Sequence, residues 1–221
     1  MPAQLFKLLA YGALSGAILC AAPAAAAPAP VQKLVYVAHH SRYGRIGTFT
    51  NTVTRNGDET DVDTEIRIAV SFVGITVFRQ DASRQERWNG GRLVSFHGVT
   101  TTNGNSIELS GSAQDDHFVM QKPNGETIVA PASVKLANPW SAAALRGDSM
   151  FTPDRGRLDD VKITTGSAEI DIGGKPVHVT RYDVFLLDGE KKYEVDVDDG
   201  GTVDQFVIYS SDGAITFSLG G

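Results

Sequence analysis

The stretch DVDTEIRIAVSF at residues 61–72 decides the fold class, because polar and apolar side chains alternate along its whole length. One side carries Val62, Thr64, Ile66, Ile68, Val70 and Phe72, and the other carries Asp61, Asp63, Glu65, Arg67, Ala69 and Ser71. A period of two residues is that of a β-strand and does not fit a helix, whose period is about 3.6 residues. The stretch therefore predicts a long strand with one side in solvent.

Directly after this strand the alternation changes phase, since Val73, Ile75 and Val77 now carry the apolar set around Gly74. Glycine within a strand often marks a bulge or a bend. We interpret the change of phase as a bulge or bend at Gly74 within the strand. Such a bend would allow a long sheet to curl over its own apolar face.

Eight dipeptides of turn-forming residues separate the alternating stretches. Two-residue hairpin turns need positive φ angles, which Gly, Asn and Asp adopt at low cost. The dipeptides therefore predict a run of antiparallel hairpins. They are Asn56-Gly57, Asn89-Gly90, Asn103-Gly104, Asn124-Gly125, Gly173-Gly174, Asp188-Gly189, Asp199-Gly200 and Asp212-Gly213.

Further strands are expected where the same alternation recurs. The fold class is all-β and mainly antiparallel, a strongly curved sheet or barrel of roughly ten to twelve strands. The further strands are residues 46–55, 84–88, 92–101, 106–110, 117–122, 126–129, 157–164, 167–172, 177–187, 192–198, 203–210 and 214–219.

Residues 130–154 interrupt this pattern and are rich in Pro and Ala. Within them, residues 138–147 begin with Asn138 as a capping residue and Pro139 at the first helical position, and end at Gly147. This order predicts a short helix of roughly two to three turns. We expect that helix to be a lid or plug of the curved sheet.

The first residues are typical of an export signal. Lys7 precedes an apolar run at residues 8–22. We expect cleavage between Ala26 and Ala27, which makes residues 1–26 a signal peptide and residues 27–221 a single β-barrel-like domain, periplasmic or secreted. Lipidation at Cys20 is an alternative, but the residue before a lipidated cysteine should be small, and here it is leucine.

Removal of the signal would leave 19 basic and 26 acidic residues, a net charge of −7. Nucleic-acid binding needs clustered Lys and Arg, so this balance argues against a nucleic-acid partner. No apolar stretch after the signal approaches the length of a membrane span. We therefore expect a monomer that does not span a membrane.

No residue pattern is typical of a catalytic or metal site. The acidic residues at 194–199 alternate as in a calcium loop, but the required glycine and glutamate are missing, and the alternative is a solvated strand face leading into a turn. The five histidines show no metal-binding spacing. We expect no metal and no cofactor. The sequence favours a protein that is not an enzyme, although convergence of His97, His117 or His178 on carboxylates would indicate one.

Four residues are candidates for a ligand cavity: Trp88, Trp140, Arg181 and Tyr182. Arg181 lies in a strand that is apolar at both ends, and if it points inward it needs a buried carboxylate or the anionic head of a ligand. The alternative is an arginine at the edge or rim, paired with a neighbouring Asp. For the two tryptophans the alternative is packing in the core or at the rim.

Several motifs are shared with a known family, namely residues 86–96, residues 100–104, Pro131 with Asn138-Pro139-Trp140, Arg181-Tyr182 and residues 212–219. In these motifs the chain resembles an exported bacterial domain-of-unknown-function family, number 6134, which is related to family 3108. The resemblance implies an envelope location and a β-rich fold, without an established activity or catalytic residue. The architecture it implies is similar to the half-open barrels of periplasmic lipoprotein carriers, which hold acyl chains.

The leading hypothesis is a non-enzymatic periplasmic binding or carrier protein, with an apolar cavity for a hydrophobic small molecule or lipid. The alternative is a structural or protein-interaction module of the cell envelope, with a packed barrel and a functional outer surface. The third hypothesis is a hydrolase-type enzyme, which rests on the histidines alone.

Overall fold

The computed structural model describes residues 29–187 and 190–220, and in these residues it forms 15 strands of a single sheet. Most consecutive strands pair as antiparallel hairpins, β1 pairs with β15, and β9 runs parallel to β10. The predicted signal peptide lies outside the described residues. The strands are β1 (Val31–His40), β2 (Gly44–Asn56), β3 (Glu59–Phe72), β4 (Ile75–Asn89), β5 (Arg92–Thr102), β6 (Asn105–Gln114), β7 (His117–Gln121), β8 (Thr127–Pro131), β9 (Lys135–Leu136), β10 (Ser149–Thr152), β11 (Arg157–Ile172), β12 (Lys175–Leu186), β13 (Lys191–Val197), β14 (Val203–Ser210) and β15 (Gly213–Leu219).

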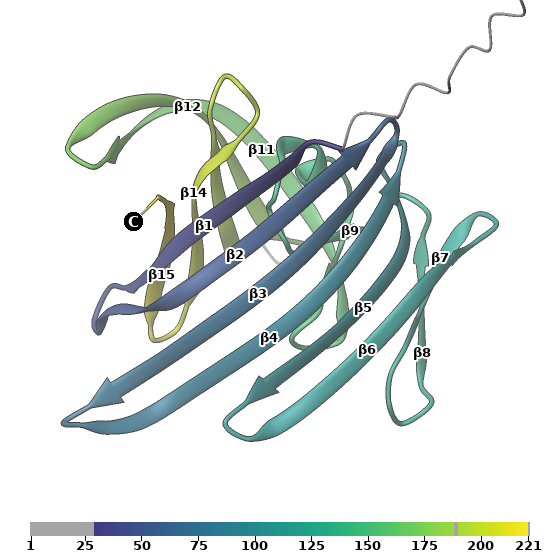
Figure 1. The fold of residues 1–221 in the computed structure, drawn as a ribbon, viewed down its shortest axis with the longest axis horizontal. Helices are drawn as coiled ribbons and strands as arrows, with labels where there is room; N and C mark the ends of the chain where they lie inside the picture. Colours follow the sequence, from purple (N-terminus) through teal and green to yellow (C-terminus); the bar gives the residue numbers. More distant parts are fainter. Residues whose placement is uncertain (1–28, 188–189, 221) are drawn as a thin grey trace, which may run out of the picture.

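The sheet curls into a barrel-like shape but is not closed. β8 and β9 are its two edges, because the strand order runs from β8 to β1, continues with β15 and descends to β9. In Figure 1, β1 to β6 form one curved wall, and β11, β12 and β14 lie behind it. Side chains from the two walls meet in the interior, as in the edge-on contact of Phe49 on β2 with Phe206 on β14. No helix among the described residues is both long and apolar enough to cross a membrane.

The predicted hairpins are confirmed wherever the structure describes them. Seven of the eight turn dipeptides lie where one strand ends and its antiparallel neighbour begins. The eighth, Asp188-Gly189, lies outside the described residues. At the β5–β6 turn, for example, Asn103 and Gly104 have φ angles of 50° and 85°. Turn chemistry therefore sets seven of the connections between consecutive strands in the described residues.

The predicted bulge or bend at Gly74 is wrong, because the chain reverses there. Val73 and Gly74, with φ angles of 50° and 78°, form the turn between β3 and β4. Both central residues of such a turn need positive φ. The alternation changes phase because a new strand begins at Ile75. The predicted strand at 84–88 is the end of this 15-residue strand.

The number of strands is also higher than the predicted ten to twelve. Strands β1, β9 and β10 were not among those predicted from alternation. The ranges 157–164 and 167–172 form one continuous strand, β11, because Thr165 and Gly166 between them stay extended and pair with β12.

The predicted helix at residues 138–147 is wrong as well. Within this range the structure forms one 3-10 turn, η1 (Ala142–Leu145). Asn138 does not cap a helix, because its side-chain amide donates instead to Thr64 Oγ1 at 2.9 Å and to Glu86 Oε1 at 2.5 Å. The segment nevertheless packs against the inner face of the sheet, where the last two residues of η1 are buried.

The interior of the sheet contains two large buried clusters, which we call the packed half and the cavity half, and a smaller third one that includes Met150, Val161 and Val184. The packed half is the buried cluster in which side chains of β2 to β8 meet the segment at residues 134–151, and it includes Val62, Trp88, Trp140 and Phe151. The cavity half is the cluster between β1 to β4 and β13 to β15, and it includes Phe49, Ile68, Phe206 and Phe217.

The inward side chains of β4 extend from one half to the other. At the cavity end they are mainly apolar, in the middle they are charged, and at the packed end they finish with an indole. In chain order they are Phe78, Gln80, Ala82, Arg84, Glu86 and Trp88. A single strand therefore positions both charged groups at the boundary between the halves.

Candidate functional site: an apolar cavity with a charged inner end

The cavity half encloses a cavity of about 940 Å³. Side chains of β2, β3 and β4 form one wall, and side chains of β13, β14 and β15 form the other. Phe206 stacks on Phe217 with ring centroids 4.4 Å apart, and Ile68 and Val70 belong to the facing wall. Ligand pockets have volumes of about 300–1,000 Å³ and are mostly apolar, so the cavity is large enough for a ligand.

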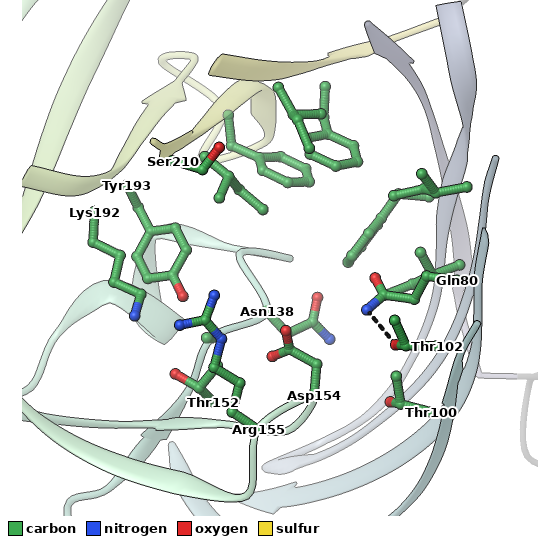
Figure 2. A pocket seen from close by; sticks show the side chains of 18 of the residues that line it. Gln80, Thr100, Thr102, Asn138, Thr152, Asp154, Arg155, Lys192, Tyr193 and Ser210 are labelled. Atoms are coloured by element: carbon green, nitrogen blue, oxygen red, sulfur yellow. Dashed lines mark hydrogen bonds between the residues drawn. The ribbon is translucent and has the colours of Figure 1, made fainter. Parts of the chain in front are cut away.

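Polar side chains gather in two groups within the cavity (Figure 2). On β4 and β5, Gln80 donates to Thr102 Oγ1 at 3.2 Å, and Thr100 lies beside them. The second group lies on the opposite side, near the loop that follows β10 and the start of β13. It consists of Thr152, Asp154, Arg155, Lys192 and Tyr193.

Arg84 belongs to the cavity wall and is only 5% exposed. Its cross-strand neighbour on β5 is Gly98. A Cβ at that position would lie 3.2 Å from Arg84 Cγ, so the glycine leaves room for the aliphatic part of the arginine side chain (the stem). The Nε of Arg84 is buried without a hydrogen-bond partner, and no acceptor among the described residues bonds to its guanidinium. Burial lowers the pKa of Arg84, and the carboxylates of Asp154 and Glu86 oppose this shift.

Glu86, two residues further along β4, accepts hydrogen bonds from three N–H donors. Trp88 Nε1 donates to Oε2 at 2.8 Å, Trp140 Nε1 donates to the same oxygen at 3.2 Å, and Asn138 Nδ2 donates to Oε1 at 2.5 Å. These donors favour the ionised carboxylate, but its removal from water outweighs them and raises the pKa of Glu86 to about 7.

A closed ring of hydrogen bonds extends from Asn138. Its Nδ2 donates to Thr64 Oγ1 at 2.9 Å, the Thr64 hydroxyl donates to Asn51 Oδ1 at 2.7 Å, and Asn51 Nδ2 donates to Asn138 Oδ1 at 3.1 Å. All three side chains are buried. The ring ties the segment after β9 to β2 and β3. Because Asn138 lines the cavity, the ring also fixes the end of the cavity beside Asn138 and Arg84, which we call the inner end.

Comparison with known families identifies the family of this chain. A family model described as a domain of unknown function, DUF6134, matches residues 42–219. The chain belongs to the DUF6134 family. This confirms the family suggested by the sequence motifs, and the matched range spans strands from both halves of the interior. No match is found among curated proteins.

Two solved structures are similar to this DUF6134 chain. The first is a beta-barrel-like protein of family DUF1849 from Brucella abortus, with a TM-score of 0.60, 12% identity, and coverage of 87% of this chain and 96% of that one. The second is a duf1089 family protein from Pseudomonas aeruginosa, with 13% identity and coverage of 86% and 95%, whose TM-score of 0.38 carries no argument. The first similarity shows a barrel-like fold.

The predicted cavity residues Trp88 and Trp140 do not line the cavity of this DUF6134 chain. They belong to the packed half, where their rings meet edge-on with centroids 5.9 Å apart. Both indoles donate to Glu86. Their placement agrees with the alternative of core packing, and the Glu86 carboxylate that they bind does not line the cavity either.

Arg181 and Tyr182 lie on β12, outside the set of cavity-lining residues. Tyr182 packs against the cavity half, whereas Arg181 faces the other side of the sheet and pairs with its cross-strand neighbour. Its Nε and Nη2 donate to Asp196 at 2.7 and 3.0 Å, and Nη2 lies 3.0 Å from a Glu194 oxygen. Arg181 is therefore paired with a neighbouring Asp, as the alternative to a ligand role had it.

These pairs also correct the interpretation of the acidic residues at 194–199. Glu194 and Asp196 are 7% and 0% exposed, so this strand face is buried and not solvated. Asp198 serves the following turn, because its Oδ1 accepts the Thr202 N–H at 2.7 Å. Glu194 and Asp196 bind Arg181, Glu194 also accepts from the Tyr209 hydroxyl, and Asp198 stabilises the turn.

The three histidines that could have indicated catalysis lie on different strands. His97, His117 and His178 belong to β5, β7 and β12, and each lies beside one carboxylate. The described residues contain no group of three or more His, Cys, Asp or Glu side chains placed to hold a metal ion. The histidines do not converge on one site.

Sequence reasoning missed Arg84 and Glu86, although a signal for them was present. Both lie in phase with Trp88 on a strand whose alternate positions, such as Arg87, are exposed. If Trp88 points inward, then Arg84 and Glu86 must also point inward. Two charges on the core face of a strand are unusual, and they marked the boundary of the cavity.

Proposed function

We propose that this DUF6134 protein is a non-enzymatic binding or carrier protein that holds a hydrophobic or lipid-like ligand in its cavity. The observation that carries the proposal is a largely apolar cavity of about 940 Å³ between two walls of one sheet. Burying apolar ligand surface in such a space is favourable, by about 25 cal/mol for each Å² removed from water.

The structure of the inner end supports the proposal. A cavity lined by flexible side chains could collapse, but the hydrogen-bonded ring of Asn51, Thr64 and Asn138 is buried and links the segment after β9 to the sheet. A preformed cavity costs less to fill than one that must open. We propose further that the protein acts after export and cleavage between Ala26 and Ala27, in the periplasm or outside the cell.

The test uses the neutral apolar fluorophore N-phenyl-1-naphthylamine and two variants with the same added ring. Ile68→Trp would narrow the cavity, because Ile68 lines it, whereas Ala69→Trp would add the ring on the exposed side of β3. We expect the wild type and Ala69→Trp to bind the fluorophore, and Ile68→Trp to bind it at least about tenfold more weakly. Equal binding by all three proteins would refute a cavity site.

A protein-interaction module of the cell envelope is the second candidate, and one observation favours it. Phe72, Val73 and Ile75 at the β3–β4 turn are 64%, 83% and 68% exposed. Val73 also holds a φ of 50°, which is strained for a β-branched residue. Strained positions often have a function. A partner with a small apolar pocket would suit this turn.

Photocrosslinking in cells tests this candidate, with a photoreactive residue at position 73. A discrete crosslinked product that disappears in the Phe72→Ser/Ile75→Ser variant would favour the module. The absence of a product would count against it. The same variant should still bind N-phenyl-1-naphthylamine, because its substitutions lie outside the cavity. Loss of the crosslink with unchanged fluorophore binding would therefore separate the partner surface from the cavity site.

A further inference from the structure

Arg84 has a geometry that packing alone does not explain. The side chain is 5% exposed and lies in the wall of the cavity. Its Nε is buried and unpartnered, and no acceptor among the described residues bonds to the guanidinium. Leaving a buried polar group unpaired is costly, and a charged group costs more than a neutral one. A buried guanidinium that faces an open cavity therefore lacks an anionic or acceptor partner.

The neighbouring carboxylates do not supply that partner. Asp154 and Glu86 are near enough to influence the charge of Arg84, but neither accepts a hydrogen bond from it. Glu86 instead accepts from Trp88, Trp140 and Asn138. Its oxygens are already directed to these donors.

The opposite side of the same end of the cavity adds positive charge. Lys192 and Arg155 line the cavity there with Tyr193, as Figure 2 shows, and Asp154 lies beside them. Lys192 Nζ lies 3.9 Å from an oxygen of Asp159, which does not line the cavity. Arg84, Arg155 and Lys192 therefore line this end with one carboxylate, Asp154, while Glu86 and Asp159, which do not line the cavity, offset part of their charge.

We infer that the cavity binds an amphiphile with an anionic head, a carboxylate or a phosphate, which Arg84 receives at the inner end while the apolar chain extends between Ile68 and Phe206. This inference rests on the proposed binding function and names the ligand class. The planar guanidinium offers two parallel N–H donors that match either oxyanion. Gly98 makes this approach possible, since it keeps β5 clear of the arginine stem.

The first experiment compares ligands of one chain length and different heads on the wild-type protein. Hexadecanoate and hexadecyl phosphate carry an anionic head, hexadecanol carries a neutral one and hexadecylammonium a cationic one. Displacement of N-phenyl-1-naphthylamine gives the four affinities. We expect the anionic ligands to bind about 10- to 100-fold more tightly than hexadecanol, as charge-assisted hydrogen bonds would give. The ratio of carboxylate to phosphate identifies the preferred head.

The second experiment tests Arg84 itself. Arg84→Met keeps the stem and removes the charge, and Arg87→Met is the matched control, because Arg87 is an exposed arginine on the same strand paired with Glu59 and Asp61. We expect Arg84→Met to lose the preference for anionic heads and keep its affinity for hexadecanol. Arg87→Met should bind all four ligands as the wild type does.

Several outcomes would overturn the inference while the proposed function stands. Equal affinity of the wild type for hexadecanoate and hexadecanol would do so without any variant, even if Arg84→Met failed to fold. If Arg84→Met lost affinity for hexadecanoate and for hexadecanol by the same factor, the arginine would have a structural role. If the wild type bound none of the four ligands or the fluorophore, the proposed function itself would fail.

Discussion

The packed half and the cavity half share strands β2 to β4, yet one is filled and the other is open. On β3, Val62 contacts the packed half, whereas Ile68 and Val70 line the cavity. The alternation of the strand is the same at both ends. The packed half differs because β5 to β8 and the segment at residues 134–151 add side chains to it, among them Trp140 and Phe151.

The boundary between the halves shows how a cavity is kept open. Glu86 and the ring of Asn51, Thr64 and Asn138 are buried polar groups that need fixed partners. A fully satisfied polar network is specific in its geometry. The segment is therefore held at one depth inside the sheet, and the space beyond it stays free for a ligand.

Breaking the packed half should have the largest effect. Trp140→Ala removes a buried indole that packs on Trp88 and donates to Glu86, so we expect a loss of about 3–5 kcal/mol in the free energy of unfolding. Trp140→Phe keeps a ring and loses one hydrogen bond, at a cost of about 1–2 kcal/mol. Urea denaturation measures both. A loss below about 1 kcal/mol for the alanine variant would show that this half is not packed.

The boundary should make stability depend on pH. The folded-state pKa of Glu86, about 7, lies above its ordinary value of 4.5, so the folded protein holds this proton more tightly than the unfolded chain. The stabilisation is complete below pH 4.5 and is lost as the pH rises through 7. We expect wild-type stability to fall by up to about 3 kcal/mol relative to Glu86→Gln over this range. Unfolding free energies that change in parallel for the two proteins would contradict the shift.

A matched pair of substitutions on β3 compares the halves directly. Val62→Ala removes methyl groups from the packed half and should cost about 2 kcal/mol. Val70→Ala removes the same atoms from a side chain that is 7% exposed and lines the cavity, so it enlarges an existing space instead of opening a new one, and should cost about 1–1.5 kcal/mol. Urea denaturation of both variants provides the comparison. Equal losses would mean that the two halves are equally filled.

The β3–β4 turn lies outside both halves and should give the smallest effect. Val73 has a φ of 50°, as Asn103 has in the β5–β6 turn. Asparagine adopts this conformation more readily than a β-branched residue. We expect Val73→Asn to stabilise the protein by about 1 kcal/mol and to leave fluorophore binding unchanged. A loss of stability in thermal or urea unfolding would show that Val73 supports the fold.

Local features of the fold could be predicted from the sequence because their causes are local. The alternation at 61–72 predicted which side chains of β3 face inward, and Val62 to Val70 on that face are buried in the structure. Turn dipeptides predicted the hairpins. Gly74 misled the prediction, because a bulge and a turn both use glycine and produce the same change of phase.

The candidate site could not be predicted in the same way, because its contacts are distant in the chain. Asn138 bonds to Glu86 across 52 residues and to Asn51 across 87. The helix prediction assigned Asn138 to a cap, and only the folded sheet brings these competing partners within reach. Whether Arg84 lines a cavity or a packed core depends on how deeply the segment after β9 enters the sheet.

Methyl NMR of the protein titrated with hexadecanoate tests the central claim most directly. Resonances of Ile66, Ile68 and Val70 in the cavity half should shift, whereas those of Val62 and Leu93 in the packed half should stay in place. These residues lie on the same wall of the sheet, so the comparison needs no variant. Shifts of equal size in both halves, or no shifts in either, would contradict a division between a packed half and a binding cavity.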